Sequence, residues 1–198
     1  KIKIGHNKKN LKNVNAVVFS SAISQKNPEI QEAKKKQIPI VSRADMLSEL
    51  MKNKKCIAVA GSHGKTTTTS LVGNILESGK LDPTIVNGGI INSFSKNNKF
   101  GKGKWMVVEA DESDGSFLHL QPDVAVVTNI DNDHLSFYDL DQGKLNQSFV
   151  SFAENLPFYG YILLNLDDVN IRKISRDIHR NQITFGFTSK NRFQILNI

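Results

Sequence analysis

The sequence predicts an α/β fold in which helices flank a mostly parallel sheet, and three observations predict it. An apolar run at residues 56–60 leads directly into the glycine turn Gly61-Ser62-His63-Gly64-Lys65-Thr66. After that turn, short apolar runs alternate with helical patterns. Polar and acidic residues follow two of the later runs, where parallel strands would end.

The first 52 residues predict a small α/β segment. Residues 14–20 are expected to form a buried strand, and residues 38–41 a second, short one. Asn27-Pro28-Glu29 predicts a helix start, because it combines a capping amide, a proline at the first position and an acid in the first turn. Apolar residues at 44, 46, 47 and 50 predict a short helix, and the basic stretch 52–55 is the expected linker. Since two strands cannot cover their own sheet, we expect the chain to begin inside a domain.

The turn at residues 61–66 has the composition of a phosphate cradle. A turn that opens a helix directs unpaired backbone N–H groups, and the positive end of the helix dipole, at an anion. The two glycines can take positive φ, Lys65 can reach β and γ oxygens of a polyphosphate, and the Thr66 hydroxyl can hold magnesium. The predicted nucleotide-binding residues are therefore Gly61, Ser62, His63, Gly64, Lys65, Thr66 and Thr67.

The general pattern G-x-x-x-x-G-K-[ST] requires a glycine at position 59, where this chain has Val59. A bare G-K-T run arises by chance in many proteins, so the alternative is a glycine turn with a surface lysine. The surroundings favour the cradle, because a strand precedes the turn and a helix that ends at Gly79 follows it. That helix is expected to bury one face, made of Leu71, Val72, Ile75 and Leu76.

The rest of the chain continues the alternation. A helix predicted over residues 145–156 places Leu145, Phe149, Phe152 and Leu156 on one stripe. Strands alternating with helices imply a mostly parallel sheet with right-handed crossovers. The predicted strands are 83–86, 105–108, 124–128, 161–164 and 182–185, with a polar loop at 87–104.

Acids follow the strand predicted at residues 105–108. The run 109–114 holds four acids in six residues, and Glu109 adjoins the strand directly. Ligands of open α/β sheets bind at the carboxyl ends of strands, so a carboxylate here can meet a magnesium ion held by Thr66. The alternative is a solvated acidic loop. The position of Glu109 next to its strand favours the metal ligand.

A histidine follows the strand predicted at residues 124–128. His134 ends the polar run 128–134 and can ligate a metal, bind phosphate or cap a loop. Taken alone, the structural role is favoured. No Cys/His spacing indicates zinc, and the single cysteine, Cys56, lies in an apolar strand, which argues against thiol catalysis.

The composition of the chain indicates which binding partners and which cellular compartment to expect. The formal charge is +7, but the lysines are dispersed and arginines are few, so surface lysines are favoured over nucleic-acid binding. No apolar run is long enough to cross a membrane, and no secretory signal is visible. One cysteine cannot form an internal disulfide, and a cytoplasmic location fits.

Together these segments resemble the Mur ligases, and the resemblance covers nearly the whole chain. Its most specific part is the run GSHGKTTTTS at residues 61–70, joined by the acidic block 109–120. The other matching blocks are Ser20-Ser21-Ala22-Ile23, Asn27-Pro28-Glu29, Arg43-Ala44-Asp45-Met46-Leu47, Asn87-Gly88-Gly89, residues 127–130 with Asp133-His134, and residues 155–160.

The resemblance implies ATP-dependent amide formation through an acyl phosphate, with ATP and magnesium as cofactors and UDP-N-acetylmuramate and L-alanine as substrates. It implies that Lys65 binds the β and γ phosphates, that Thr66 and Glu109 hold magnesium, and that His134 helps hold a second metal. Lys65, Glu109 and His134 are then the catalytic residues. Residues implied to contact the UDP-sugar substrate are His6, Ser20, Ser21, Asn87 and Gly88.

The resemblance also implies a domain division. Residues 1–52 would be part of a Rossmann-like UDP-binding domain, and residues 53–198 most of the central P-loop ATPase domain. The family's N-terminal glycine-rich turn, its G-x-H-N-x-x-N segment and its C-terminal domain have no counterpart in the sequence, so we expect this piece to turn over poorly alone.

Alternatives remain within and outside the family. A ligase that recycles murein tripeptide onto UDP-N-acetylmuramate shares the P-loop, but it typically has tyrosine where this chain has Ser113. A nucleotide-binding module without catalysis and a nucleic-acid-binding domain are the alternatives of other classes.

Overall fold

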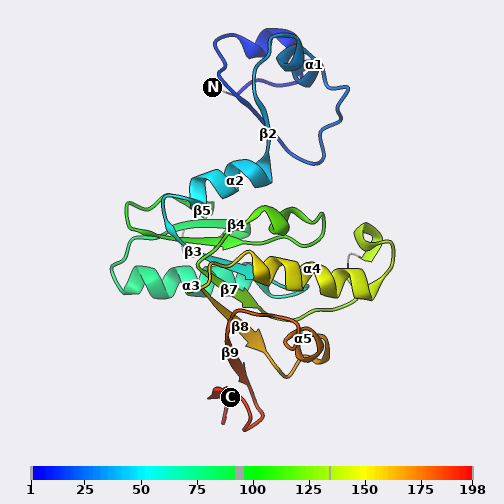
Figure 1. Ribbon diagram of the computed structural model, residues 1–198. Coiled ribbons are helices and arrows are strands. Elements are labelled where there is room, and N and C mark those ends of the chain that lie inside the picture. Colours follow the sequence, from blue (N-terminus) through cyan, green and yellow to red (C-terminus); the bar gives the residue numbers. More distant parts are fainter. Residues whose placement is uncertain (1, 92–95, 134, 198) are drawn as a thin grey trace. The chain divides into compact units, whose positions relative to one another are not determined.

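The computed structural model describes residues 2–91, 96–133 and 135–197 (Figure 1). The chain forms two compact units, Lys1–Glu49 and Leu50–Ile198. The junction lies inside helix α2, Arg43–Met51.

The first unit is small and has two strands. It contains η1 (Lys8–Leu11), β1 (Val17–Phe19), α1 (Pro28–Lys35) and β2 (Ile40–Ser42), and β1 pairs with β2 in parallel. Asn27 caps α1 as predicted, since its side-chain oxygen accepts a 2.8 Å hydrogen bond from the N–H of Glu29. The prediction of a buried strand over 14–20 is wrong in length and burial: β1 has three residues, and Val18 is 48% exposed. A two-stranded sheet has too few neighbours to enclose it.

The second unit is built on an eight-stranded sheet, and the predicted α/β fold is confirmed. The strand order is β10-β9-β8-β7-β3-β6-β4-β5. All described pairs are parallel except β4 with β5, which form an antiparallel edge. The strands are β3 (Lys55–Ala60), β4 (Thr84–Ile91), β5 (Lys96–Lys99), β6 (Trp105–Glu109), β7 (Val124–Val127), β8 (Tyr161–Asn165), β9 (Asn181–Gly186) and β10 (Phe193–Gln194).

Helices cover both faces of this sheet. The chain passes through α3 (Lys65–Ser78) from β3 towards β4, and through α4 (Gln142–Glu154) and α5 (Val169–Ile174) from β7 to β8 to β9. These connections run in opposite directions along the sheet, so right-handed crossovers place α3 on one face and α4 and α5 on the other. Figure 1 shows these helices beside the stacked strands. Two 3₁₀ turns, η2 (Ser116–His119) and η3 (Leu135–Tyr138), complete the described elements of this unit.

The core under α4 follows the predicted stripe. Leu145, Phe149, Phe152 and Leu156 are all buried. The ring of Phe117 stacks on Phe152 with centroids 5.0 Å apart and meets Phe149 edge-on at 5.2 Å. Burial of several large apolar side chains, each worth about 1.5–3 kcal/mol, anchors η2 and the acidic block before it.

Only part of the face predicted for α3 is buried, since Val72 and Leu76 are half-buried. Leu71 is 57% and Ile75 70% exposed, whereas Thr69 and Gly73 are buried. A Cβ on Gly73 would lie 2.5 Å from Cδ1 of Ile85 in β4, so the helix approaches the sheet too closely for a larger residue. Small residues of α3 therefore form its contact with the sheet. The spacing of the large apolar residues does not identify this face.

Two further expectations need correction. The polar loop predicted at 87–104 contains the end of β4 and all of β5, because strand pairing at a sheet edge tolerates polar residues. The linker predicted at 52–55 is shorter, since α2 reaches Met51 and Lys55 already pairs with Trp105 in the sheet. The short elements α5 and β10 were not anticipated.

Candidate phosphate-binding site

The site lies at the carboxyl edge of the sheet, where the polar residues that follow β3, β6 and β7 meet. The glycine turn follows β3, the acidic block begins at the end of β6, and residues 128–133 follow β7. β3 lies between β6 and β7, so the turn is flanked by both. This juxtaposition is the one predicted from strand ends.

The glycine turn has the backbone that its two glycines were expected to allow. Gly61 has φ 134° and Gly64 has φ 78°. A Cβ on Gly61 would lie 2.2 Å from Oγ1 of Thr128, whereas a Cβ on Gly64 would meet no atom within 4 Å. Gly64 is the N-cap of α3 and no side chain caps the helix in the described structure. The first N–H groups of α3 are therefore available to an anion.

Side chains after β7 fix the turn in place. The Thr128 hydroxyl donates to the His63 carbonyl at 2.7 Å, and the His63 N–H donates to Oδ1 of Asn129 at 2.8 Å. The Asp131 N–H donates to Oγ of Ser62 at 2.8 Å. Thr128 and Asn129 were not among the predicted site residues. Their position directly after a buried strand was the signal that could have found them.

Lys65 folds back over the turn and pairs with an acid. Its Nζ donates to the carbonyl of Gly61 at 2.7 Å and lies 3.4 Å from that of Ser62. It also lies 3.1 Å from Oε1 and 2.9 Å from Oε2 of Glu112, whose side chain has no exposed surface. Glu112 was missed in the prediction, which gave it no role within the acidic block.

The backbone of Glu112 is tied to η3. The Tyr138 hydroxyl donates a 2.6 Å hydrogen bond to the Glu112 carbonyl, and burial raises the pKa of this phenol above its usual value. The acidic block is thereby held to the segment that follows residue 134.

Thr66 and Glu109, the residues predicted to hold magnesium, are joined by a hydrogen bond. The Thr66 hydroxyl donates to Oε2 of Glu109 at 3.0 Å, and the N–H of Gly88 donates to the same oxygen at 2.8 Å. A hydroxyl and a carboxylate side by side are the oxygen donors that magnesium prefers, so these residues fit that ion. Within the described residues no group of three His, Cys, Asp or Glu side chains is placed to hold a metal.

Asn87 and Gly88 lie in β4 beside α3. The Asn87 amide donates to the Thr66 carbonyl at 3.2 Å and to Oγ of Ser70 at 2.9 Å, and Asn87 is buried. A Cβ on Gly88 would lie 3.0 Å from Oε1 of Glu109. A substrate role for the two residues stays a prediction.

His63 extends from the cradle towards two acids. Its Nε2 lies 3.4 Å from Oδ2 of Asp131 and 3.5 Å from Oδ2 of Asp133. The backbone N–H of Asn132, and then the His63 side chain, hold the pKa of the Asp131 carboxyl below its usual range. Thr67 lies exposed in the first turn of α3. His134, predicted as a metal ligand, lies outside the described residues.

The predicted substrate residues of the first unit fall in two places. His6 lines a polar pocket of about 360 Å³ with Asn10 and Glu29, and its Nδ1 lies 2.9 Å from Oε2 of Glu29. Hydrogen bonds from His6 and Asn10 hold the pKa of Glu29 below its usual value. Ser20 and Ser21 lie in the exposed turn after β1, where Oγ of Ser20 accepts from the Ala22 N–H at 3.3 Å.

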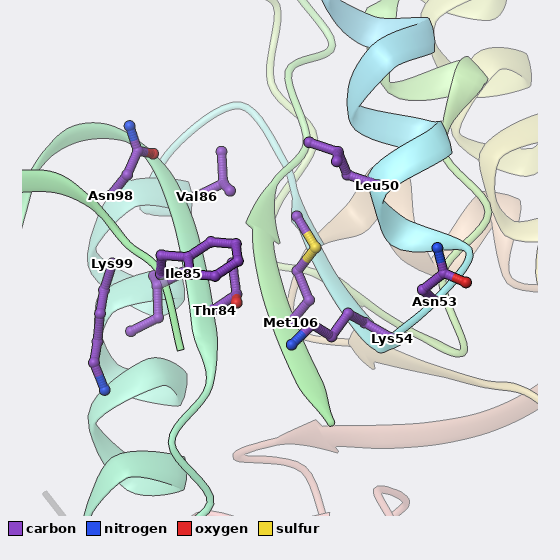
Figure 2. Close-up of a pocket in the computed structure, with 10 residues that line it drawn as sticks. Leu50, Asn53, Lys54, Thr84, Ile85, Val86, Asn98, Lys99 and Met106 are labelled. Carbon is purple, nitrogen blue, oxygen red and sulfur yellow. The ribbon is translucent and has the colours of Figure 1, made fainter. Parts of the chain in front are cut away.

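A separate, apolar pocket of about 320 Å³ lies in the second unit, away from the glycine turn (Figure 2). Val86, Met106 and Leu50 are among its lining residues. The Lys54 ammonium at its rim donates to the carbonyls of Gly101 and Gly103, at 3.3 and 2.5 Å. The Lys54 ammonium is thus engaged with the backbone of the protein itself.

The sequence matches two domain families along its length. Residues 59–198 match the Mur ligase middle domain, and residues 1–55 match the catalytic domain of the Mur ligase family. The chain belongs to the Mur ligase family. The glycine turn, the acidic block and residues 128–134 all fall within the middle domain.

Curated relatives are identical to this Mur ligase chain at about half of the aligned positions. A UDP-N-acetylmuramate--L-alanine ligase from Vesicomyosocius okutanii is 51% identical over 193 residues, 98% of this chain and 41% of the relative. A protein of the same name from Geobacter sulfurreducens is 49% identical over 96% of this chain and 41% of its own length. The chain thus spans about two fifths of these relatives.

Solved structures agree with the family. The UDP-N-acetylmuramate-alanine ligase of Thermotoga maritima matches with a TM-score of 0.80 and 28% identity, over 95% of this chain and 42% of that one. A UDP-N-acetylmuramate:L-alanyl-γ-D-glutamyl-meso-diaminopimelate ligase from Neisseria meningitides has a TM-score of 0.81 at 24% identity, over 94% and 63% of the two chains, and shows the shared fold alone. No helix in the described ranges is long and apolar enough to span a bilayer.

Proposed function

We propose that this Mur ligase chain forms the nucleotide-binding part of an enzyme that uses ATP to join L-alanine to UDP-N-acetylmuramate. The observation that carries the proposal is that two side chains in the first turn of the uncapped helix α3 contact acids, Lys65 with Glu112 and Thr66 with Glu109. Relatives that are 49–51% identical and bear the name UDP-N-acetylmuramate--L-alanine ligase support this choice of substrates.

The proposed reaction has two balanced steps. A carboxylate oxygen of the muramyl group attacks the γ-phosphorus of ATP, the bond from that phosphorus to the β-bridging oxygen breaks, and ADP leaves. The alanine amine then attacks the acyl carbon, phosphate leaves with the electron pair of the C–O bond, and the amine loses a proton. An anion attacking an anion requires positive charge nearby, which Lys65 and the first N–H groups of α3 supply.

We assign magnesium to Thr66 and Glu109, with His134 as a ligand of a second metal. The 3.0 Å contact of a hydroxyl with a carboxylate supports the first assignment. A bound magnesium ion would offset the charge of the phosphates. Without it, Glu109 still fixes the orientation of the Thr66 hydroxyl and the Gly88 N–H, since both donate to it.

We also assign parts of the chain to the substrate. Residues 1–52 would belong to the UDP-binding domain and residues 53–198 to the central domain. His6, Ser20 and Ser21 would contact the UDP portion, and Asn87 and Gly88 the muramyl side. The polar pocket beside His6 supports the first of these contacts. A cytoplasmic location is proposed with this activity, since a lone buried cysteine needs no oxidising compartment.

The test measures phosphate release by the full-length gene product with UDP-N-acetylmuramate and a panel of amino acids and peptides. Release that requires both the nucleotide sugar and L-alanine supports the proposal. Release with murein tripeptide but not with alanine would replace it with the recycling ligase. Binding of ATP with no release under any condition would leave a nucleotide-binding module without catalysis.

A further inference from the structure

Glu112 is a buried acid beside the glycine turn that the proposed chemistry does not use. Its side chain has no exposed surface and its Oε2 lies 2.9 Å from Nζ of Lys65. Within the described residues Oε2 accepts no hydrogen bond of good geometry. Lys65 is therefore the cation that offsets the charge of Glu112.

The Lys65 ammonium has three N–H donors, and the protein engages all of them. One hydrogen bond goes to the Gly61 carbonyl, a longer one to the Ser62 carbonyl, and the third contact is with Glu112. A phosphate oxygen that approaches Lys65 must therefore take the place of one of these acceptors.

The cost of displacement decides which acceptor is lost. Removing Lys65 from Glu112 would leave a buried, unpaired charge, whereas the carbonyl of Ser62 accepts only a 3.4 Å bond. Breaking the contact of Lys65 with a loop carbonyl thus costs less free energy than breaking its contact with Glu112. Lys65 is expected to turn towards phosphate while its contact with Glu112 persists.

We infer that Glu112 is a positioning residue that holds Lys65 from behind during polyphosphate binding and, as an anion, lowers the affinity of the cradle for polyphosphate. This inference rests on the proposed function. The Glu112 carboxylate opposes the charge of the incoming phosphates, so its presence favours product release over tight binding.

The experiment measures tripolyphosphate and ATP affinity of this chain by calorimetry. Glu112→Gln removes the charge but keeps an oxygen that can accept from Lys65, so both ligands should bind about tenfold more tightly. Asp177→Asn, an exposed acid after α5, is the matched control for net charge and should leave affinity unchanged. A merely structural role for Glu112 cannot produce a gain in affinity.

A second measurement uses the unaltered chain, so it does not depend on the folding of a variant. Nuclear Overhauser contacts between Hε of Lys65 and Hγ of Glu112 should persist when tripolyphosphate saturates the site. Loss of these contacts, or unchanged or weaker binding by a folded Glu112→Gln variant, would overturn the inference while leaving the proposed function intact. If the unaltered chain binds neither ligand, the proposed function itself fails and the inference fails with it.

Discussion

Thr66 donates its hydroxyl hydrogen to Oε2 of Glu109 at 3.0 Å, across the gap between α3 and the end of β6. The same oxygen accepts the N–H of Gly88 in β4 at 2.8 Å. One carboxylate oxygen thus joins the helix that follows the cradle to two neighbouring strands. A change at Glu109 should therefore affect both a bound cation and the position of Gly88.

Glu109→Gln should weaken Mn²⁺ binding in the presence of ATP by about tenfold or more, since it removes the charged oxygen donor. Electron paramagnetic resonance of Mn²⁺ titrated against this chain and ATP measures the effect. Affinity for ATP without metal should change much less, because Lys65 and the first turn of α3 remain. Equal metal affinity in Glu109→Gln and the unaltered chain would show that the metal assignment is wrong.

The two glycines of the cradle should differ in their response to alanine. Gly61→Ala brings a Cβ to 2.2 Å from Oγ1 of Thr128 at φ 134°, and it should cost more than about 3 kcal/mol of unfolding free energy. Gly64→Ala meets no atom within 4 Å and should cost about 1–2 kcal/mol, from its positive φ alone. Urea denaturation followed by Trp105 fluorescence compares them. Similar losses would contradict the crowding at Gly61.

The sequence predicts that the polar strand ends lie together at one edge of the sheet. It does not predict which side chains contact one another there. Alternating apolar runs imply parallel strands, and parallel strands bring Glu109 and Thr128 to the edge that holds the glycine turn. Which of the four acids faces Lys65 depends on the course of the chain after β6. That course is fixed by Phe117 packing under α4 and by Tyr138 donating to Glu112, contacts far apart in sequence.

The face of α3 was mispredicted for a related reason. A prediction from hydrophobic periodicity assigns large apolar residues to the buried face of a helix. In the structure α3 contacts the sheet through Gly73, which packs against Ile85 of β4. The side chains of β4 determine how closely the helix approaches the sheet, and the sequence of the helix alone carries no information about them. Leu71 and Ile75 consequently lie exposed.

The Lys65–Glu112 pair should couple strongly in stability. Lys65→Met leaves Glu112 buried without a cation and should cost about 3–5 kcal/mol of unfolding free energy. Lys65→Met/Glu112→Leu removes both charges and should recover most of this loss. Denaturation with Trp105 fluorescence provides the measurement, and Lys144→Met, which breaks the exposed pair with Asp139, is the control with little expected change. A double variant no more stable than Lys65→Met would contradict the burial argument.

Cys56 should resist thiol reagents in the folded chain. Burial in β3, and then the nearby charge of Asp123, raise the pKa of its thiol to about 12. Because the thiolate is the reactive form, labelling at pH 8 should be slow and should accelerate with denaturant as the strand opens. A colorimetric thiol assay across a urea series measures this. Fast labelling without denaturant would show that β3 is accessible in the folded state.

Glu29 should make the stability of the first unit depend on pH. Its pKa is lowered chiefly by the hydrogen bond with His6, and then by that with Asn10. A lowered folded pKa means that the stabilisation is present above the unfolded value and is lost as pH falls through the folded value. Hydrogen exchange of amides in η1 and α1, measured between pH 7 and pH 3, should therefore show protection falling at the acid end.

Glu29→Gln should reduce protection at neutral pH by about 1 kcal/mol, and the difference from the unaltered chain should shrink as the carboxyl protonates. Glu32→Gln, which removes only a pair with Lys36 one turn away, is the matched control and should have a smaller effect. A difference between Glu29→Gln and the unaltered chain that stays constant with pH would rule out this carboxylate as the source.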